Sequence, residues 1–312
     1  MPQIVASITM LQSMSRLLGR QAAALSCGHQ VRGMAWAGRS FAAAAPAPQP
    51  VEETAAPSAA LMIIGDEVLS GSISDSNTPF LAKLLHSRGV DLVRAEFVPD
   101  CKRDIVDTVL RLRERVGPDG FVFTSGGIGP THDDITYASV AAAFGADLHM
   151  HQPTVDLMVQ HYSKRDVELN EARLRMAMLP MDDGVEVLFT PNLWVPLVVI
   201  QNTYILPGIP RLFQTMVQAH AERFKGPAAL THVLYSNLGE GDIAVKLASA
   251  AALHPAVRIG SYLNTEWEPN AGKLPYRVKL QLESRNAAAL QRAVEAVEQA
   301  LPDTFTLPAH AS

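Results

Sequence analysis

Residues 121–136 constrain the fold of this chain more than any other segment. The apolar run FVFTS at 121–125 is typical of a buried β-strand, and Gly126, Gly127 and Gly129 follow it directly. Glycine lets the backbone approach a ligand and turn its N–H groups inward, and a following helix N-terminus adds partial positive charge. The segment therefore predicts a strand, a phosphate-binding turn and a helix in succession.

Two carboxylates, Asp133 and Asp134, lie at the rim of this turn. Carboxylates repel a phosphate unless a divalent cation lies between them, so the pair indicates phosphate together with metal. We also expect Asp133 to cap the helix that runs to Phe144. A purely structural turn is the alternative, because many α/β proteins have glycines after a strand.

A second acidic segment follows the apolar strand LMII at 61–64. Asp66 and Glu67 come directly after it, and Asp75 and Asn77 lie further along the same loop. The carboxyl ends of parallel strands meet at one edge of a sheet, where ligands bind. Both acidic segments are thus expected to face one pocket. Separately, the acids fit a solvated turn and Asn77 fits a helix cap.

The rest of the first part alternates between strand and helix, which predicts an α/β fold with a three-layer, mainly parallel sheet. We expect a hairpin at 197–206 around the turn Gln201-Asn202, and a helix at 211–224 with Pro210 in its first turn. The other expected elements are a helix from Asn77 or Thr78 to Gly89, a strand at 90–98, a helix at 103–116, a helical segment at 154–178, and a loop that carries His149 and His151.

A boundary is expected at Lys225-Gly226-Pro227, which divides a domain of residues 58–226 from a small α+β module of residues 227–305, with a tail at 306–312. In the module we expect strands at 231–238, 257–263 and 276–282 and helices at 242–253 and 286–301. Asp242 is expected to cap the first of these helices.

The first 50 residues contain arginine but no aspartate or glutamate, as transit peptides do. We interpret residues 1–57 as a transit peptide and an Ala/Pro linker. The step Arg39-Ser40-Phe41 favours a mitochondrial address, and a chloroplast is the alternative. A net charge of −5 argues against a nucleic-acid partner, and no apolar run reaches the length of about 18 residues that a membrane helix needs.

Four blocks in this order carry a family resemblance: GDEVLSG at 65–71, DSN at 75–77, GGIGPTHDDIT at 126–136 and LPGIP at 206–210. They resemble the molybdopterin-binding-like domain shared by MoaB/MogA proteins, the CinA family and eukaryotic FAD synthases. The segments IGSY at 259–262 and YRVKL at 276–280 look like the continuation found in FAD synthases.

The branches of this family differ in their chemistry. Molybdopterin adenylyltransferases carry an arginine where this chain has Asp133, and a glycine-rich loop where residues 190–196 contain no glycine. In the CinA and FAD-synthase branches, the resemblance implies metal-dependent hydrolysis of the pyrophosphate in ADP-ribose or FAD. The leading hypothesis is a pyrophosphatase. Molybdopterin adenylylation or binding, and a nucleotide-binding module without turnover, are the alternatives.

The resemblance and the two turns together predict the site. The expected catalytic residues are Asp66, Asp133 and Asp134. The expected metal ligands are Asp66, Glu67 and Asp134. They would bind Mg²⁺, Mn²⁺ or Co²⁺, with K⁺ as a further ion. The expected ligand-binding residues are Gly65, Gly71, Asp75, Asn77, Thr124, Ser125, Gly126, Gly127, Gly129, Pro130, Thr131, Thr136, Pro207 and Gly208. The expected partners are a small-molecule nucleotide and, as in relatives, further copies of the chain.

Some neighbouring side chains have two interpretations. His132 is a general base, a metal ligand or a local hydrogen-bonding group, and Arg173 or Arg175 either holds a phosphate or covers a solvated helix face.

Overall fold

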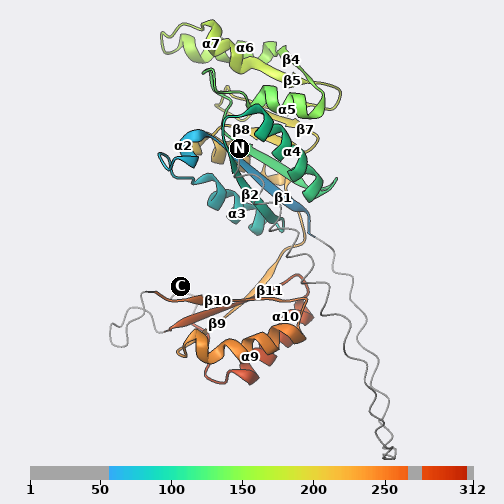
Figure 1. Ribbon diagram of the computed structural model, residues 1–312, viewed down its shortest axis with the longest axis vertical. Coiled ribbons are helices and arrows are strands. Elements are labelled where there is room, and N and C mark those ends of the chain that lie inside the picture. The colour runs from blue at the N-terminus through green and yellow to red at the C-terminus, as the bar shows by residue number, and fades with distance from the viewer. Residues whose placement is uncertain (1–55, 266–275, 308–312) are drawn as a thin grey trace, which may run out of the picture. The chain divides into compact units, whose positions relative to one another are not determined.

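The computed structural model describes residues 56–265 and 276–307 (Figure 1). The predicted transit peptide and most of its linker lie outside these residues, as does the end of the tail. The described part contains a six-stranded sheet, a three-stranded sheet and a two-stranded sheet.

The six-stranded sheet has the order β2-β1-β3-β8-β7-β6. Strands β2, β1, β3 and β8 are parallel neighbours, and β7 and β6 continue the sheet antiparallel. This confirms the predicted mainly parallel sheet. Its strands are β1 (Ser58–Ile64), β2 (Asp91–Val98), β3 (Phe121–Ser125), β6 (Glu186–Leu188), β7 (Leu197–Ile200) and β8 (Thr203–Leu206).

Helices cover both faces of this sheet, and β1 shows why. Its side chains alternate between two cores, so that Met62 packs with residues of α4 (Lys102–Val116) and α5 (Thr136–Phe144). Leu61 packs with α3 (Asn77–Ser87) and α8 (Pro210–Ala219). Because successive strand residues point to opposite faces, a strand that is apolar at every position requires a layer of helices on each side.

The predicted hairpin is confirmed between β7 and β8. Gln201 and Asn202 form its turn with φ of 46° and 59°. Positive φ at both central residues is the geometry that matches the twist of two antiparallel strands, and asparagine tolerates it well. The helix expected at 211–224 is observed as α8 (Pro210–Ala219), so it ends earlier than predicted and a 3-10 turn, Ala221–Arg223, follows it.

The segment from His149 to Met181 differs from the prediction. His149 lies in the strand β4 (Asp147–Met150), which pairs with β5 (Met178–Met181), and not in a loop. The expected helix at 154–178 is broken into α6 (Gln152–Ser163) and the single turn α7 (Glu171–Leu174), followed by a short 3-10 turn. At the break, Asp166 has a φ of 55°, which a continuous helix cannot contain.

The small module forms an antiparallel sheet of order β10-β11-β9, with two helices packed against it. Its elements are β9 (Leu230–Ser236), α9 (Glu240–Leu253), β10 (Arg258–Leu263), β11 (Val278–Ser284) and α10 (Ala287–Ala300). At the start of α9, the Asp242 carboxylate accepts a hydrogen bond from the Gly239 N–H at 3.1 Å, the expected capping role. Asn286 accepts from the Ala289 N–H at 2.9 Å and caps α10.

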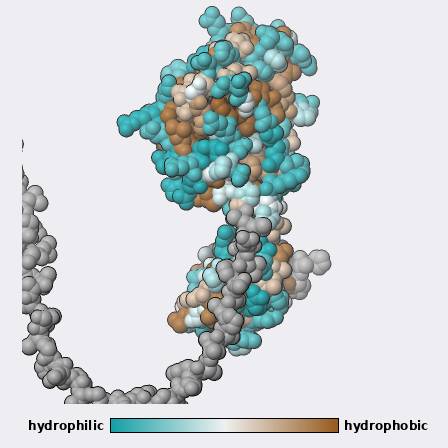
Figure 2. All heavy atoms as spheres, turned by 90° about the vertical axis from the view of Figure 1, so that its right-hand side faces the viewer, coloured by the Kyte–Doolittle hydropathy of each residue, from teal (hydrophilic) through white to brown (hydrophobic). Residues whose placement is uncertain are grey.

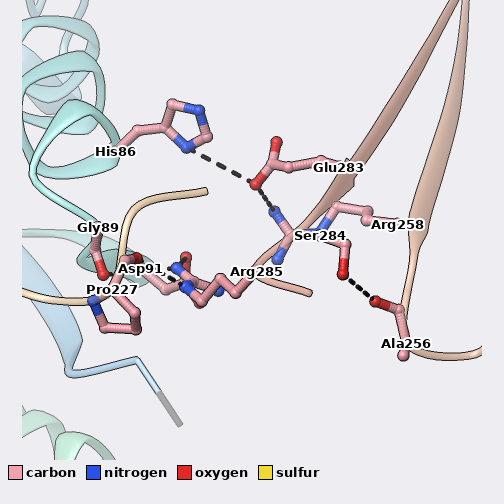
Figure 3. Close-up of polar contacts among 9 residues, drawn as sticks. All are labelled: His86, Gly89, Asp91, Pro227, Ala256, Arg258, Glu283, Ser284 and Arg285. Atoms are coloured by element: carbon pink, nitrogen blue, oxygen red, sulfur yellow. Dashed lines mark hydrogen bonds and ion pairs between the residues drawn. The ribbon is translucent and has the colours of Figure 1, made fainter. Parts of the chain in front are cut away.

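Polar contacts join the end of β11 to the start of β2 (Figure 3). The Arg285 guanidinium donates to the Asp91 carboxylate at 2.9 Å and to the Pro227 carbonyl at 3.1 Å. The Glu283 carboxylate, 9% exposed, lies 3.8 Å from the imidazole of His86 and 3.6 Å from the guanidinium of Arg258.

Hydrophobic and hydrophilic residues are interspersed on the face shown in Figure 2. Strand β2 is an edge of the large sheet, where Val93 and Phe97 are exposed. Its Glu96 carboxylate pairs with Arg94 and Arg111, and charges of this kind discourage edge-to-edge strand pairing. Among the described helices, none combines the length and the apolar character that crossing a bilayer requires.

Candidate functional site

The glycine turn after β3 is held by the first residue of α5. The Thr136 hydroxyl donates to the Gly126 carbonyl at 2.9 Å, and the Thr136 N–H donates to the Gly127 carbonyl at 2.9 Å. Gly126 has a φ of +115°, and a Cβ there would lie 2.1 Å from the Ile64 carbonyl oxygen. Only glycine fits this position, where the turn after β3 passes the end of β1.

The two carboxylates of this turn differ in their surroundings. Asp134 accepts hydrogen bonds from the Thr131 N–H at 2.8 Å and from the Thr131 hydroxyl at 2.5 Å, through Oδ2 in both cases. Asp133 is exposed and lies 3.9 Å from the His132 imidazole, whose side chain is 98% exposed. The prediction that Asp133 caps the helix is wrong. Helix α5 begins three residues later, because Thr136 and not Asp133 closes the turn.

The acidic segment after β1, which contains Asp66 and Glu67, is not an open loop at its start. Residues Asp66–Leu69 form the helical turn α2 directly after β1. The Asp66 N–H donates to the Asp100 carboxylate at 3.1 Å. The ends of β1 and β2 are therefore tied together at the edge of the sheet.

Asp100 is a residue that the sequence reasoning missed. Burial raises its pKa, the hydrogen bond from Asp66 opposes this shift, and the negative charges of Glu67, Asp66 and Asp133 raise the pKa further. Acids from three strand ends therefore share one electrostatic environment. The signal was present in the sequence, because Asp100 follows the strand predicted at 90–98 just as Asp66 follows the strand before it.

Asn77 connects its own segment with the end of β3 and the turn after β8. The Asp75 carboxylate accepts hydrogen bonds from the Asn77 and Thr78 N–H groups and so fixes the start of α3. The Asn77 amide nitrogen then donates to the Ser125 hydroxyl at 2.9 Å and to the Gly208 carbonyl at 3.0 Å. Asn77 is only 4% exposed, and within the described residues its Oδ1 has no hydrogen-bond partner. Such an orphaned acceptor fits a site that a ligand completes.

A cavity of about 560 Å³ lies at this edge of the sheet, a size typical of small-molecule sites. The predicted residues that line it are Glu67, Asp75, Asn77, Ser125, Gly126, Gly127, Gly129, Pro130, Asp134, Pro207 and Gly208. The predicted residues that are not among its lining are Gly65, Asp66, Gly71, Thr124, Thr131, Asp133 and Thr136. Both acidic segments reach the cavity, each through one of its two adjacent acids.

Aromatic residues form a part of the cavity wall that the sequence reasoning did not single out. Tyr137, Tyr162 and Trp194 line it together with Met176. Burial raises the pKa of the Tyr137 phenol, whose oxygen has no hydrogen-bond partner within the described residues. Of the two arginines considered, Arg175 donates to the Thr131 carbonyl at 3.2 Å, and Arg173 lies over the Tyr162 ring.

The carboxylate oxygens that line this cavity are the type of ligand that a hard divalent cation prefers. In residues 56–265 and 276–307, no group of three or more His, Cys, Asp or Glu side chains is placed to hold a metal ion. Magnesium is commonly bound by one or two carboxylates together with water and substrate phosphates, and Glu67 and Asp134 supply two. A cation bound jointly with a phosphate is therefore compatible with the donor set, whereas a fully protein-built cage is not.

The comparison with protein families decides what kind of domain holds this cavity. Residues 60–226 match the family described as "Probable molybdopterin binding domain". The chain belongs to this family. Its molybdopterin-binding-type domain contains the whole cavity lining, and residues 228–310 match a second family, "FAD synthase, middle domain". The predicted resemblance is thus confirmed for both parts of the chain.

Two relatives are similar to this molybdopterin-binding-type chain in sequence. A CinA-like protein of Myxococcus xanthus is 35% identical over 162 residues, which cover 51% of this chain and 37% of that protein. A probable FAD synthase of Caenorhabditis elegans is 28% identical over 266 residues, covering 78% of this chain and 50% of that protein. The chain thus spans half or less of the length of these two relatives.

Among solved structures, the protein CinA of Thermoplasma acidophilum is 26% identical with a TM-score of 0.47. The match covers 54% of this chain and 98% of that one.

Proposed function

We propose that this chain is a metal-dependent nucleotide pyrophosphatase that acts on FAD, ADP-ribose or a related dinucleotide. One observation carries the proposal: a glycine turn and two carboxylates from different strand ends, Glu67 and Asp134, line the same cavity. A diphosphate needs both a backbone that it can approach and a cation that neutralises its charge.

The glycine turn would hold the phosphate oxygens. Gly127 and Gly129 line the cavity without side chains, so the backbone there is open to a close approach. Asn77 adds a buried polar group whose amide nitrogen is fixed by Ser125 and Gly208. These contacts would orient the diphosphate before it reacts.

Glu67 and Asp134 would hold the divalent cation, with phosphate oxygens and water as its other ligands. When bound, such an ion lowers the pKa of a water molecule and polarises the phosphate. Asp100 interacts electrostatically with Glu67 and Asp66, so Asp100 and Asp66 would add negative charge near the cation. Asp133 is exposed and would contribute through its charge alone.

The reaction is a hydrolysis of a phosphoric anhydride. The oxygen of water forms a bond to one phosphorus, the bridging P–O bond to the other phosphate breaks, and the proton of water is released. FAD would yield FMN and AMP, and ADP-ribose would yield ribose 5-phosphate and AMP. The name of one relative, a probable FAD synthase, supports FAD as a dinucleotide of this kind.

The test measures AMP released by the purified chain from FAD and from ADP-ribose, with Mg²⁺, Mn²⁺ or Co²⁺ and with EDTA. Glu67→Gln and Asp134→Asn are expected to lower kcat by about a hundred-fold or more, because each removes a charge from the cation position. Asp119→Asn is the matched control, since Asp119 precedes β3 and lies at the opposite end of that strand from the cavity.

Three results would overturn the proposal. The first is AMP release that is equally fast in EDTA. The second is adenylylation of molybdopterin in place of hydrolysis. The third is nucleotide binding without turnover under all metal conditions, the behaviour of a binding module.

A further inference from the structure

The phosphate chemistry leaves part of the cavity lining unused. Tyr162, Met176 and Trp194 belong to this part, and none of these side chains carries a charge. We infer that Trp194 and Tyr162 bind the planar heteroaromatic ring of a nucleotide by stacking. This inference rests on the proposed function and deepens it, because it assigns ring-binding residues in the same cavity.

Trp194 is held by a local turn and by packing from one side. The Leu193 N–H donates to the Thr190 carbonyl at 3.1 Å, and Asn192 between them has a φ of 66°. The Trp194 side chain packs against a small cluster that contains Met158 and Met176. The indole therefore rests on the protein at one side and contributes to the cavity wall as well.

Tyr162 is fixed next to this indole. The two ring centroids lie 5.9 Å apart at an interplanar angle of 50°. The Arg173 guanidinium lies over the Tyr162 ring at 5.4 Å, and the His161 imidazole lies 6.0 Å from Trp194. Contacts of this kind reduce the freedom of the rings before a ligand binds, which lowers the entropy cost of stacking.

A polar group lines the same cavity as these rings. Tyr137 is 7% exposed and lines the cavity, and its hydroxyl has no hydrogen-bond partner within the described residues. A buried hydroxyl without a partner is costly, so a ligand that accepts its hydrogen bond would be favoured. Heteroaromatic rings and the sugar attached to them carry such acceptors, and a purely apolar ligand does not.

Adenine and isoalloxazine share this chemistry, and the experiment separates them. Trp36→Phe and Trp267→Phe would leave Trp194 as the only tryptophan, because the chain has three. AMP and FMN are titrated as ring-bearing probes, and ribose 5-phosphate and pyrophosphate as ring-free probes. Trp194 emission reports on AMP, and calorimetry gives the Kd for all four probes.

We expect Trp194→Leu to raise the Kd of AMP, FMN or both by about ten-fold or more, the effect of losing one base–aromatic stack. If adenine is the ring that stacks, AMP also quenches Trp194 emission. Whichever ring loses affinity is the one that stacks there. The Kd of pyrophosphate should stay unchanged in the same variant. Trp194→Phe keeps a ring and should restore most of the affinity, which guards against a variant that merely folds poorly.

The inference is overturned if Trp194→Leu leaves the Kd of both ring-bearing probes unchanged, or weakens pyrophosphate equally. Its failure differs from a failure of the proposed function. If Trp194→Leu still hydrolyses the dinucleotide with an unchanged KM, the ring-binding inference fails and the pyrophosphatase proposal stands. If ring binding depends on Trp194 but no hydrolysis occurs, the pyrophosphatase proposal fails and the ring-binding inference stands.

Discussion

The side-chain amide of Asn77 donates a hydrogen bond to the carbonyl oxygen of Gly208, 131 positions later in the chain, at 3.0 Å. The same nitrogen donates to the Ser125 hydroxyl at 2.9 Å. One buried side chain therefore links the start of α3, the end of β3 and the turn after β8. The geometry of the cavity depends on this link, since all three residues line it.

Asn77→Ala is expected to lower the free energy of unfolding by about 1–3 kcal/mol, because it removes two hydrogen bonds and leaves the buried Ser125 hydroxyl without its donor. Urea denaturation measures the change. Thr78→Val is the matched control, since the Thr78 hydroxyl is buried without a hydrogen-bond partner in the described structure. This control should be neutral or stabilising, and an equal loss in both variants would contradict the role of Asn77.

Gly126→Ala should be far more damaging than Gly71→Ala. Both glycines have positive φ, but a Cβ at Gly126 meets the Ile64 carbonyl oxygen at 2.1 Å, whereas a Cβ at Gly71 meets no atom within 4 Å. We expect a loss of about 3 kcal/mol or more for Gly126→Ala and about 1 kcal/mol for Gly71→Ala. Thermal and urea unfolding of both proteins would show the difference, and similar losses would refute the steric argument.

Arg285→Met is expected to destabilise the chain by about 1.5–3 kcal/mol, because it leaves the partly buried Asp91 carboxylate without its charged donor. Arg258→Met removes a more exposed guanidinium, with a side chain 68% exposed, and should cost less than about 1 kcal/mol. Differential scanning calorimetry of the two variants tests this order. A larger loss of stability in Arg258→Met than in Arg285→Met would contradict this prediction.

The fluorescence of Trp194 is expected to depend on the protonation of His161. Burial, together with the nearby Arg165 and Lys164 charges, holds the pKa of His161 below its ordinary value of 6.5. The imidazole is thus neutral at pH 7 and becomes charged only as the pH falls below that value. In the protein with Trp194 alone, emission should decrease on acidification with a midpoint below 6.5, since a protonated imidazole quenches indole. His161→Gln should abolish this step, and an unchanged midpoint in that variant would assign it to another group.

We propose that residues 1–57 direct the protein to mitochondria. A fusion of these residues to a fluorescent protein should co-localise with a mitochondrial dye, and replacing Arg16 and Arg20 with glutamate should leave the fusion in the cytosol, because presequences depend on positive charge. Import into chloroplasts by the same fusion would support the alternative address.

The elements whose signals are local could be predicted from the sequence alone. In these elements the residue types alone indicate the backbone geometry. They are the apolar runs at β1 and β3, the turn at Gln201 and Asn202, and the glycines after β3. The small module was also predictable, because its strands and helices keep clear periodicities. Where the pattern was weak, the prediction was wrong, because long-range pairing places His149 in β4 beside β5 and the positive φ of Asp166 interrupts the helix expected at 154–178.

The site itself was decided by tertiary structure. Sequence order could indicate that two acidic segments approach one edge of the sheet, but it made both Asp133 and Asp134 catalytic. The start of α5 at Thr136 leaves the first exposed and brings the second to the cavity wall. Likewise, Tyr162 and Trp194 are neighbours only because α6 and the loop before β7 meet at the cavity. A residue type fixes what chemistry is possible, whereas long-range packing fixes which side chains share a space.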